Sequence, residues 1–197
     1  EGGQSELGVY LRTAFCEGDF GSLFPNLDPL GTKLIDYGFS FGRQQITFQE
    51  GIMINDTLDA IGLARNNLHA PGFSNIRITG LAAVDHIDRG TPANRRRLNA
   101  PFFLGLFVQA DTTASTWAFD FITVQDDSTN STGGDGYYFG LAAIQRGWNP
   151  FNGIGTFNTA YRINASYGEG SDTPQLSDGV LLSAEVSWTP HSSDDVV

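Results

Sequence analysis

Apolar and polar residues alternate along much of the chain, and this period of two predicts β-strands. In the stretch GTFNTAYRINASYGEG, Phe157, Tyr161 and Ile163 fall on one face. Arg162 and Asn164 fall on the other face. At a helical period these polar residues would share an arc with the aromatic ones. The stretch therefore predicts a strand with one apolar face and one polar face.

Similar windows follow one another through the last two thirds of the chain. The segments between them are rich in Gly, Asn, Asp and Ser, which favour turns. None of the windows has a helical period, so the succession predicts an antiparallel meander. The predicted strands are 75–87, 100–112, 115–125, 136–147, 155–170 and 179–190.

The first third is less regular. We expect strands over 6–15 and 38–51, and a strand-like or mixed segment over 57–68. Residues 16–36 are expected to form a long loop that could fold inward as a plug or constriction. The whole chain, 1–197, is predicted to be a single β-barrel segment of about eight strands. The polar sequences at both ends suggest a piece of a longer protein.

Two all-β architectures explain such strands. In a soluble sandwich the apolar faces meet in a core, whereas in an outer-membrane barrel they meet lipid and the polar faces line a lumen. The predicted strands are close to the 9–11 residues of a tilted bilayer crossing. Aromatic residues gather near strand ends, and the polar faces carry amides and isolated charges instead of a Lys and Glu fringe. These features favour an antiparallel meander that forms part of a transmembrane β-barrel.

Composition narrows the function. Only 17% of residues are charged, and the 24 glycines and 12% aromatic residues argue against a helical bundle. The net charge of -11 disfavours a general nucleic-acid surface, which needs clustered cations. Cys16 is the single cysteine, so there is no disulfide framework. No run is long and apolar enough for a spanning helix.

The stretch FSFGRQQITFQEGIMINDTLDAIGLARNNL, within residues 38–68, resembles the alginate-export family of outer-membrane β-barrels. The resemblance rests on GRQ within a strand, a Gly-containing acidic turn, and LDAIGL in the following strand. It implies a large barrel that passes anionic or neutral saccharides through an arginine-lined pore. The chain departs from this pattern in its acidic balance and in Asp120 and Glu185 on inferred lumen faces, so alginate itself is not implied.

Polar residues on the inferred lumen faces are the candidate pore lining. Their arginines form either a cationic track for carboxylates and sugar hydroxyls, or pairs with lumen acids that stiffen the wall. Arg162 and Glu185 lie on consecutive strands and are predicted to be neighbours. Arg43 shares its parity with Phe39 and Phe41, so it reaches the lumen only if a bulge intervenes. The candidates are Arg43, Arg77, Asp120, Arg162, Asn164 and Glu185.

Residues on the opposite faces are expected to contact lipid, where a carboxylate would cost about 2–4 kcal/mol in mid-bilayer. This cost fixes Asp120 on the lumen side, away from its aromatic neighbours. The expected lipid-facing residues are Trp117, Phe119, Phe121, Phe157, Tyr161, Ile163, Val186 and Trp188.

Other chemistry is not expected. Two of the neighbours His86, Asp85 and Asp88 point to opposite faces of a strand, which disfavours a shared metal ion, and DDSTNSTGGDG lacks EF-hand spacing. No nucleophile elbow or phosphate loop is present, so neither an enzyme nor a cofactor is predicted.

The sequence therefore predicts a bacterial outer-membrane, porin-like channel for passive passage of polar solutes, with saccharides or organic acids as partners. The alternatives are a soluble carbohydrate-binding β-sandwich, in which Trp117, Trp148 or Trp188 stacks on sugars, and a structural surface β-domain.

Overall fold

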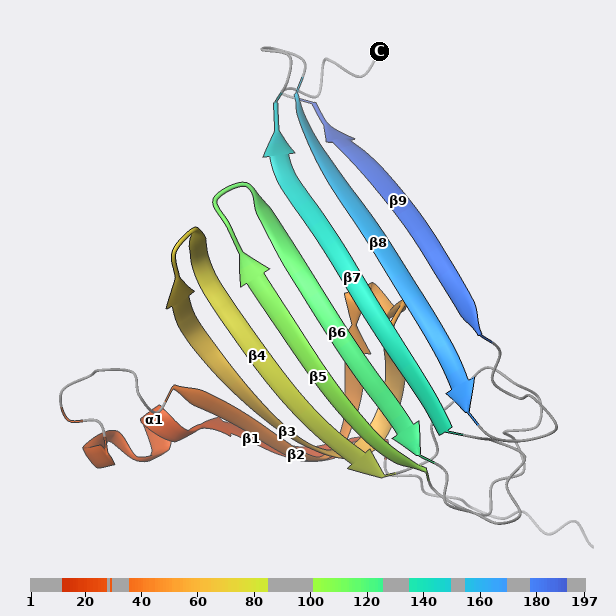
Figure 1. Ribbon diagram of the computed structural model, residues 1–197. Coiled ribbons are helices and arrows are strands. Elements are labelled where there is room, and N and C mark those ends of the chain that lie inside the picture. The colour runs from red at the N-terminus through yellow and green to blue at the C-terminus, as the bar shows by residue number, and fades with distance from the viewer. Residues whose placement is uncertain are drawn as a thin grey trace, which may run out of the picture.

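The computed structural model describes residues 12–27, 29, 36–84, 101–125, 135–149, 155–169 and 178–190. These residues confirm the all-β prediction: nine strands form one sheet in which every strand pairs antiparallel with its neighbours in the chain (Figure 1). The order along the sheet is β1 to β9 without a crossover. The strands are β1 (Ala14–Asp19), β2 (Tyr37–Phe48), β3 (Ile54–Ala70), β4 (Phe73–Val84), β5 (Phe102–Asp111), β6 (Ser115–Gln125), β7 (Asp135–Trp148), β8 (Thr156–Glu169) and β9 (Gly179–Thr189).

Helical structure is limited to short turns among the described residues. The turns are α1 (Phe20–Leu23), η1 (Pro25–Leu27) and η2 (Gln49–Gly51). None of the described helices has the length and apolar character needed to cross a bilayer.

Strand boundaries from β4 onward agree closely with the sequence pattern, and β6 has the predicted bounds. The first third differs more. β1 continues to Asp19 and leads into α1, so the segment expected to be a loop over 16–36 begins inside a strand. β3 is a continuous strand of 17 residues, longer than the predicted segment over 57–68.

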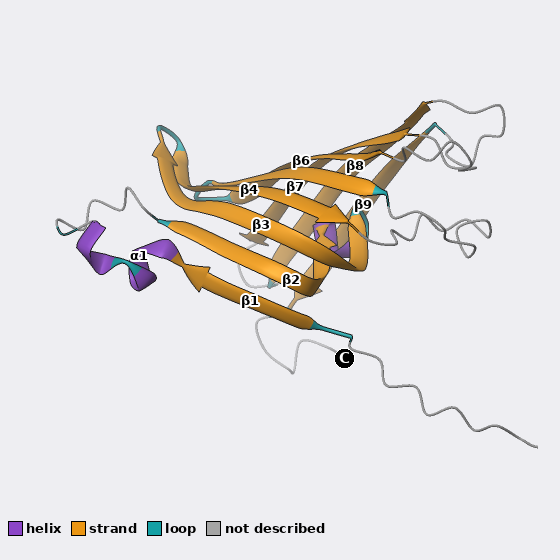
Figure 2. Ribbon diagram, turned by 90° about the horizontal axis from the view of Figure 1, so that it is seen from below, coloured by secondary structure: helices purple, strands orange, loops and turns teal. Residues whose placement is uncertain are grey.

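The ladders define two faces of the sheet, because residues paired across antiparallel strands share a face. One such row runs through Arg77, Gln109, Ala118, Ala142 and Arg162. We call the face that carries this row the inner face, because the sheet curls around it (Figure 2). The opposite side is the outer face.

The sheet also has two rims. At the turn rim, β3 and β4 are joined by Pro71 and Gly72, and β5 and β6 by residues 112–114. The connections β2–β3, β4–β5, β6–β7 and β8–β9 leave from the other end, which we call the loop rim. The pairing of β3 with β4 ends there, at Asp59 and Val84.

Residues 44–58 extend beyond this last pair and fold back over the inner face (Figure 2). We call them the inserted hairpin. Apolar side chains explain the fold, because Ile46 and Leu58 of the hairpin are buried together with Phe103 and Phe107 of β5. The Phe48 ring also stacks on Phe107, with 3.4 Å between the ring centroids. The core of the molecule therefore lies between the hairpin and the wall of the sheet.

The outer face carries large apolar side chains that nothing covers within the described part of the chain. Tyr161 and Ile163 are 54% and 47% exposed, and Leu182 is 69% exposed. The described strands form one layer, whereas the sandwich alternative requires a second sheet against this face.

Candidate functional site

The inserted hairpin turns sharply where it meets the wall. Gln49 and Glu50 have positive φ angles of 50° and 58°, and Gly51 follows with a φ of 89°. Non-glycine residues in this region cost on the order of 1 kcal/mol each. Contacts with the wall must therefore help to hold the turn in place.

Two polar contacts join the turn to the wall. Gln49 Nε2 donates to Asp120 Oδ2 on β6 at 2.6 Å. The Glu50 carboxylate pairs with the Arg162 guanidinium on β8, whose side chain is only 3% exposed. Arg162 Nη1 also lies 3.5 Å from Glu185 Oε2 on β9. The buried cation is thus balanced by two carboxylates, as burial of a charge requires.

Gly140 makes room for this contact. It lies on the inner face of β7, paired with Asp120 on one side and Asn164 on the other. A Cβ atom at this position would be 2.3 Å from Gln49 Nε2 and 2.9 Å from Asn164 Oδ1. A residue with a side chain would therefore exclude Gln49 from its present place.

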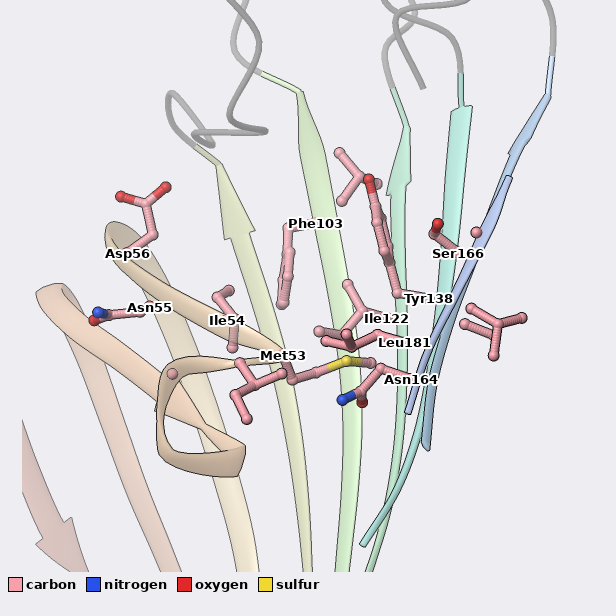
Figure 3. Close-up of a pocket in the computed structure, with 16 residues that line it drawn as sticks. Met53, Ile54, Asn55, Asp56, Phe103, Ile122, Tyr138, Asn164, Ser166 and Leu181 are labelled. Atoms are coloured by element: carbon pink, nitrogen blue, oxygen red, sulfur yellow. The ribbon is translucent and has the colours of Figure 1, made fainter. Parts of the chain in front are cut away.

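A cavity of about 550 Å³ lies against residues 51–56 of the hairpin region. Figure 3 shows Met53, Phe103, Ile122, Tyr138 and Leu181 around it, together with Asn164 and Ser166 of β8. Among the described residues of its lining, Asp56 is the charged one. This cavity is therefore mainly apolar with amide and hydroxyl groups at its edges.

A second cavity, of about 390 Å³, lies against residues 47–50. Its lining is much more charged, and a smaller neighbouring cavity of about 260 Å³ shares Glu50, Arg146 and Arg162 with it. We call the 390 Å³ space the arginine cavity. Its charged lining residues are Arg77, Arg146, Arg162, Glu50 and Asp120.

Five of the six predicted pore-lining residues lie on the inner face. Each of the five pairs across the sheet with residues of the inner face. Arg162 and Glu185 are in contact, as predicted. The observed register pairs Arg162 with Ser183, and Glu185, two residues further along β9, therefore lies on the same face as Arg162. The five residues are Arg77, Asp120, Arg162, Asn164 and Glu185.

The prediction for Arg43 is wrong. β2 pairs with β3 without a register shift from Tyr37 to Phe48, so no bulge moves Arg43 off the face of Phe39 and Phe41. Arg43 lies on the outer face at the loop rim and pairs with Asp59, with 3.1 Å between Nη1 and Oδ2.

The expected lipid-facing residues all share the outer face. Their cross-strand partners connect them in rows that never include an inner-face residue. Most are at least a third exposed, and Phe121 and Phe157 are half-buried. The residues are Trp117, Phe119, Phe121, Phe157, Tyr161, Ile163, Val186 and Trp188.

Sequence reasoning missed the main feature of the inner face. It expected residues 16–36 as the inward segment, whereas the inserted hairpin occupies that place. The signal was present in Gly51, which follows a continuous strand pattern, and in polar residues at 45, 47, 55 and 57 on the face that would otherwise contact lipid.

Metal binding finds no support in the described ranges, where no group of three potential ligands converges. His86, Asp85 and Asp88 lie outside the described residues, as does most of DDSTNSTGGDG.

Comparison with known proteins gives no match to a family model, to a curated protein or to a solved structure. The resemblance to the alginate-export family therefore stays a prediction from residues 38–68.

Proposed function

We propose that this chain forms part of the wall of an outer-membrane β-barrel through which polar solutes, such as saccharides or organic acids, pass passively. The observation that carries the proposal is the separation of the two faces. Uncovered aromatic and aliphatic residues fill the outer face, while Arg162 and its acidic partners lie on the inner face. A contiguous apolar surface of this kind indicates contact with lipid or with another protein.

Aromatic residues on the outer face support the bilayer. Trp117, Trp148 and Trp188 lie near the turn rim, at the start of β6 and the ends of β7 and β9. Tyr137 and Tyr167 lie near the loop rim, with 6.3 Å between their ring centroids. The two groups are about ten residues apart, or roughly 33 Å along a strand, which a tilt near 40° reduces to about 25 Å. This height matches the apolar band of outer-membrane barrels.

The inner face would provide the passage. Polar side chains there replace part of the hydration of a solute, and charged pairs set an electrostatic preference without a net barrier. The inserted hairpin narrows the space, because Gln49 and Glu50 reach across to β6 and β8. In this mechanism the hairpin is the constriction and selects solutes by size and charge.

A paired cysteine experiment tests the proposal. In a Cys16→Ser background, Val186→Cys places a thiol on the outer face and Ser187→Cys places one on the inner face of the same strand. The full chain is inserted into planar bilayers, and conductance is recorded while a cationic, water-soluble thiol reagent is added. We expect Ser187→Cys channels to lose conductance in discrete steps, and Val186→Cys channels to keep it.

Two results would reject the channel. One is a chain that stays folded and dissolved without detergent and gives no conductance. The other is equal reactivity of both thiols in the membrane, which would mean that water reaches both faces.

A further inference from the structure

The arginine cavity has the shape of a small-molecule site. Two small side chains, Ala118 and Ala142, are paired across β6 and β7 in its lining and leave space above the sheet. Phe48 of the inserted hairpin, stacked on Phe107, closes one side. Its volume of about 390 Å³ falls within the range of ligand pockets, roughly 300–1,000 Å³.

The carboxylates of the cavity are already engaged. Glu50 pairs with Arg162, and Asp120 accepts a hydrogen bond from Gln49. Arg77 and Arg146 are exposed and have no hydrogen-bond or ion-pair partner among the residues that the structure describes. Each guanidinium offers five N–H donors in a planar fork that fits a carboxylate. The polar groups of the cavity that are left for a ligand are therefore mainly the N–H donors of these two arginines.

The remaining polar groups suit hydroxyls. Gln109 and Thr116 line the same space. The Thr116 hydroxyl already donates to Asp111 Oδ1, so it is left to accept, whereas Gln109 spends one amide N–H on Asp111 and can still donate and accept.

We propose that the arginine cavity binds a small hydroxylated carboxylate between Arg77 and Arg146. The inference rests on the proposed function and deepens it, because it names the solute class that the passage favours. The ligand carboxylate accepts from the two guanidinium groups, and its hydroxyls meet Gln109 and Thr116.

Calorimetric titration of the full chain in detergent micelles tests this site. Gluconate is the probe, and glucitol is its neutral counterpart with the same carbon skeleton. The variants are Arg77→Gln and Arg146→Gln, and Arg43→Gln is the matched control because Arg43 lies on the outer face. All three arginines are exposed or half-exposed, so the substitutions should leave the fold intact.

We expect gluconate to bind at least tenfold more tightly than glucitol, and each inner-face substitution to weaken gluconate binding by roughly tenfold to a hundredfold. Arg43→Gln should bind as the parent does. Equal binding of the two probes, no binding of gluconate, or parent-like binding by the Arg77→Gln/Arg146→Gln double variant would each overturn the assignment. Solubility of the same sample without detergent is scored separately, so a failed membrane assignment is distinguished from a failed ligand site.

Discussion

Substitution of Gly140 by alanine tests whether contacts with the wall hold the inserted hairpin. The new Cβ atom would be 2.3 Å from Gln49 Nε2, so the amide must swing away and give up its hydrogen bond to Asp120. A hydrogen bond to a charged group contributes about 1.5–3 kcal/mol. Alanine recovers roughly 0.5–1 kcal/mol over glycine within a strand. The expected net loss of stability is therefore about 1–2 kcal/mol.

Gly80 provides the matched control. It lies on the outer face of β4, a Cβ atom there would meet nothing within 4 Å, and its φ is not in the left-handed region. Gly80→Ala should therefore be neutral or stabilise the chain by up to about 1 kcal/mol.

Two measurements read the outcome. Urea unfolding of the refolded chain gives the difference in free energy between the two variants. Electron spin resonance between labels at Ile52→Cys and Leu182→Cys, in a Cys16→Ser background, reports the distance from the hairpin to β9. In Gly140→Ala this distance should lengthen and its distribution broaden, and in Gly80→Ala it should not change. Identical stabilities and distances in the two variants would refute the role assigned to Gly140.

Three further substitutions probe the hairpin and the faces. Glu50→Gln should lower the free energy of unfolding by about 1 kcal/mol, because it removes a charged partner of buried Arg162. Asp59→Asn, in the exposed pair with Arg43 on the outer face, is the control and should cost less than about 0.5 kcal/mol in the same urea titration. Phe107→Ala should lower the free energy of unfolding by about 3–4 kcal/mol, because Phe107 is 4% exposed and its ring stacks on Phe48. Phe119→Ala on the outer face should lower it far less. Similar losses of stability in the two variants would contradict a core on the inner side. Ile163→Arg, near the middle of β8, should cost about 2–4 kcal/mol when unfolding is measured from lipid vesicles, and a neutral result would argue against contact with hydrocarbon.

The strands from β4 onward were predictable because the alternation of apolar and polar residues dominates their sequences. From β4 to β9 each strand except β5 has one apolar face and one more polar face, so alternation fixes both the boundaries and the parity, whereas β5 is apolar on both faces. Tyr161 and Arg162 are adjacent in the chain, and their exposures of 54% and 4% show how completely the two faces differ. The face assignment of Asp120 followed from the same rule.

The inserted hairpin was not predictable in this way. Its strand pattern continues through Phe48, and alternation cannot tell a strand in the wall from one that passes the rim and folds back. The decision depends on tertiary contacts, namely the packing of Ile46 and Leu58 and the space left by Gly140. The predicted face of Arg43 was wrong for a related reason. Arg43 lies at the loop rim, where a charged pair with Asp59 is tolerated on the outer face.

Quenching of tryptophan fluorescence by brominated lipids tests the central claim most directly. All three tryptophans, Trp117, Trp148 and Trp188, lie on the outer face, so no substitution is needed. In vesicles of phosphatidylcholine brominated near the headgroup, the emission should fall strongly, and deeper bromination should quench it less. Emission that brominated lipids leave unchanged, but that aqueous acrylamide quenches, would show that water or protein covers this face instead of a bilayer.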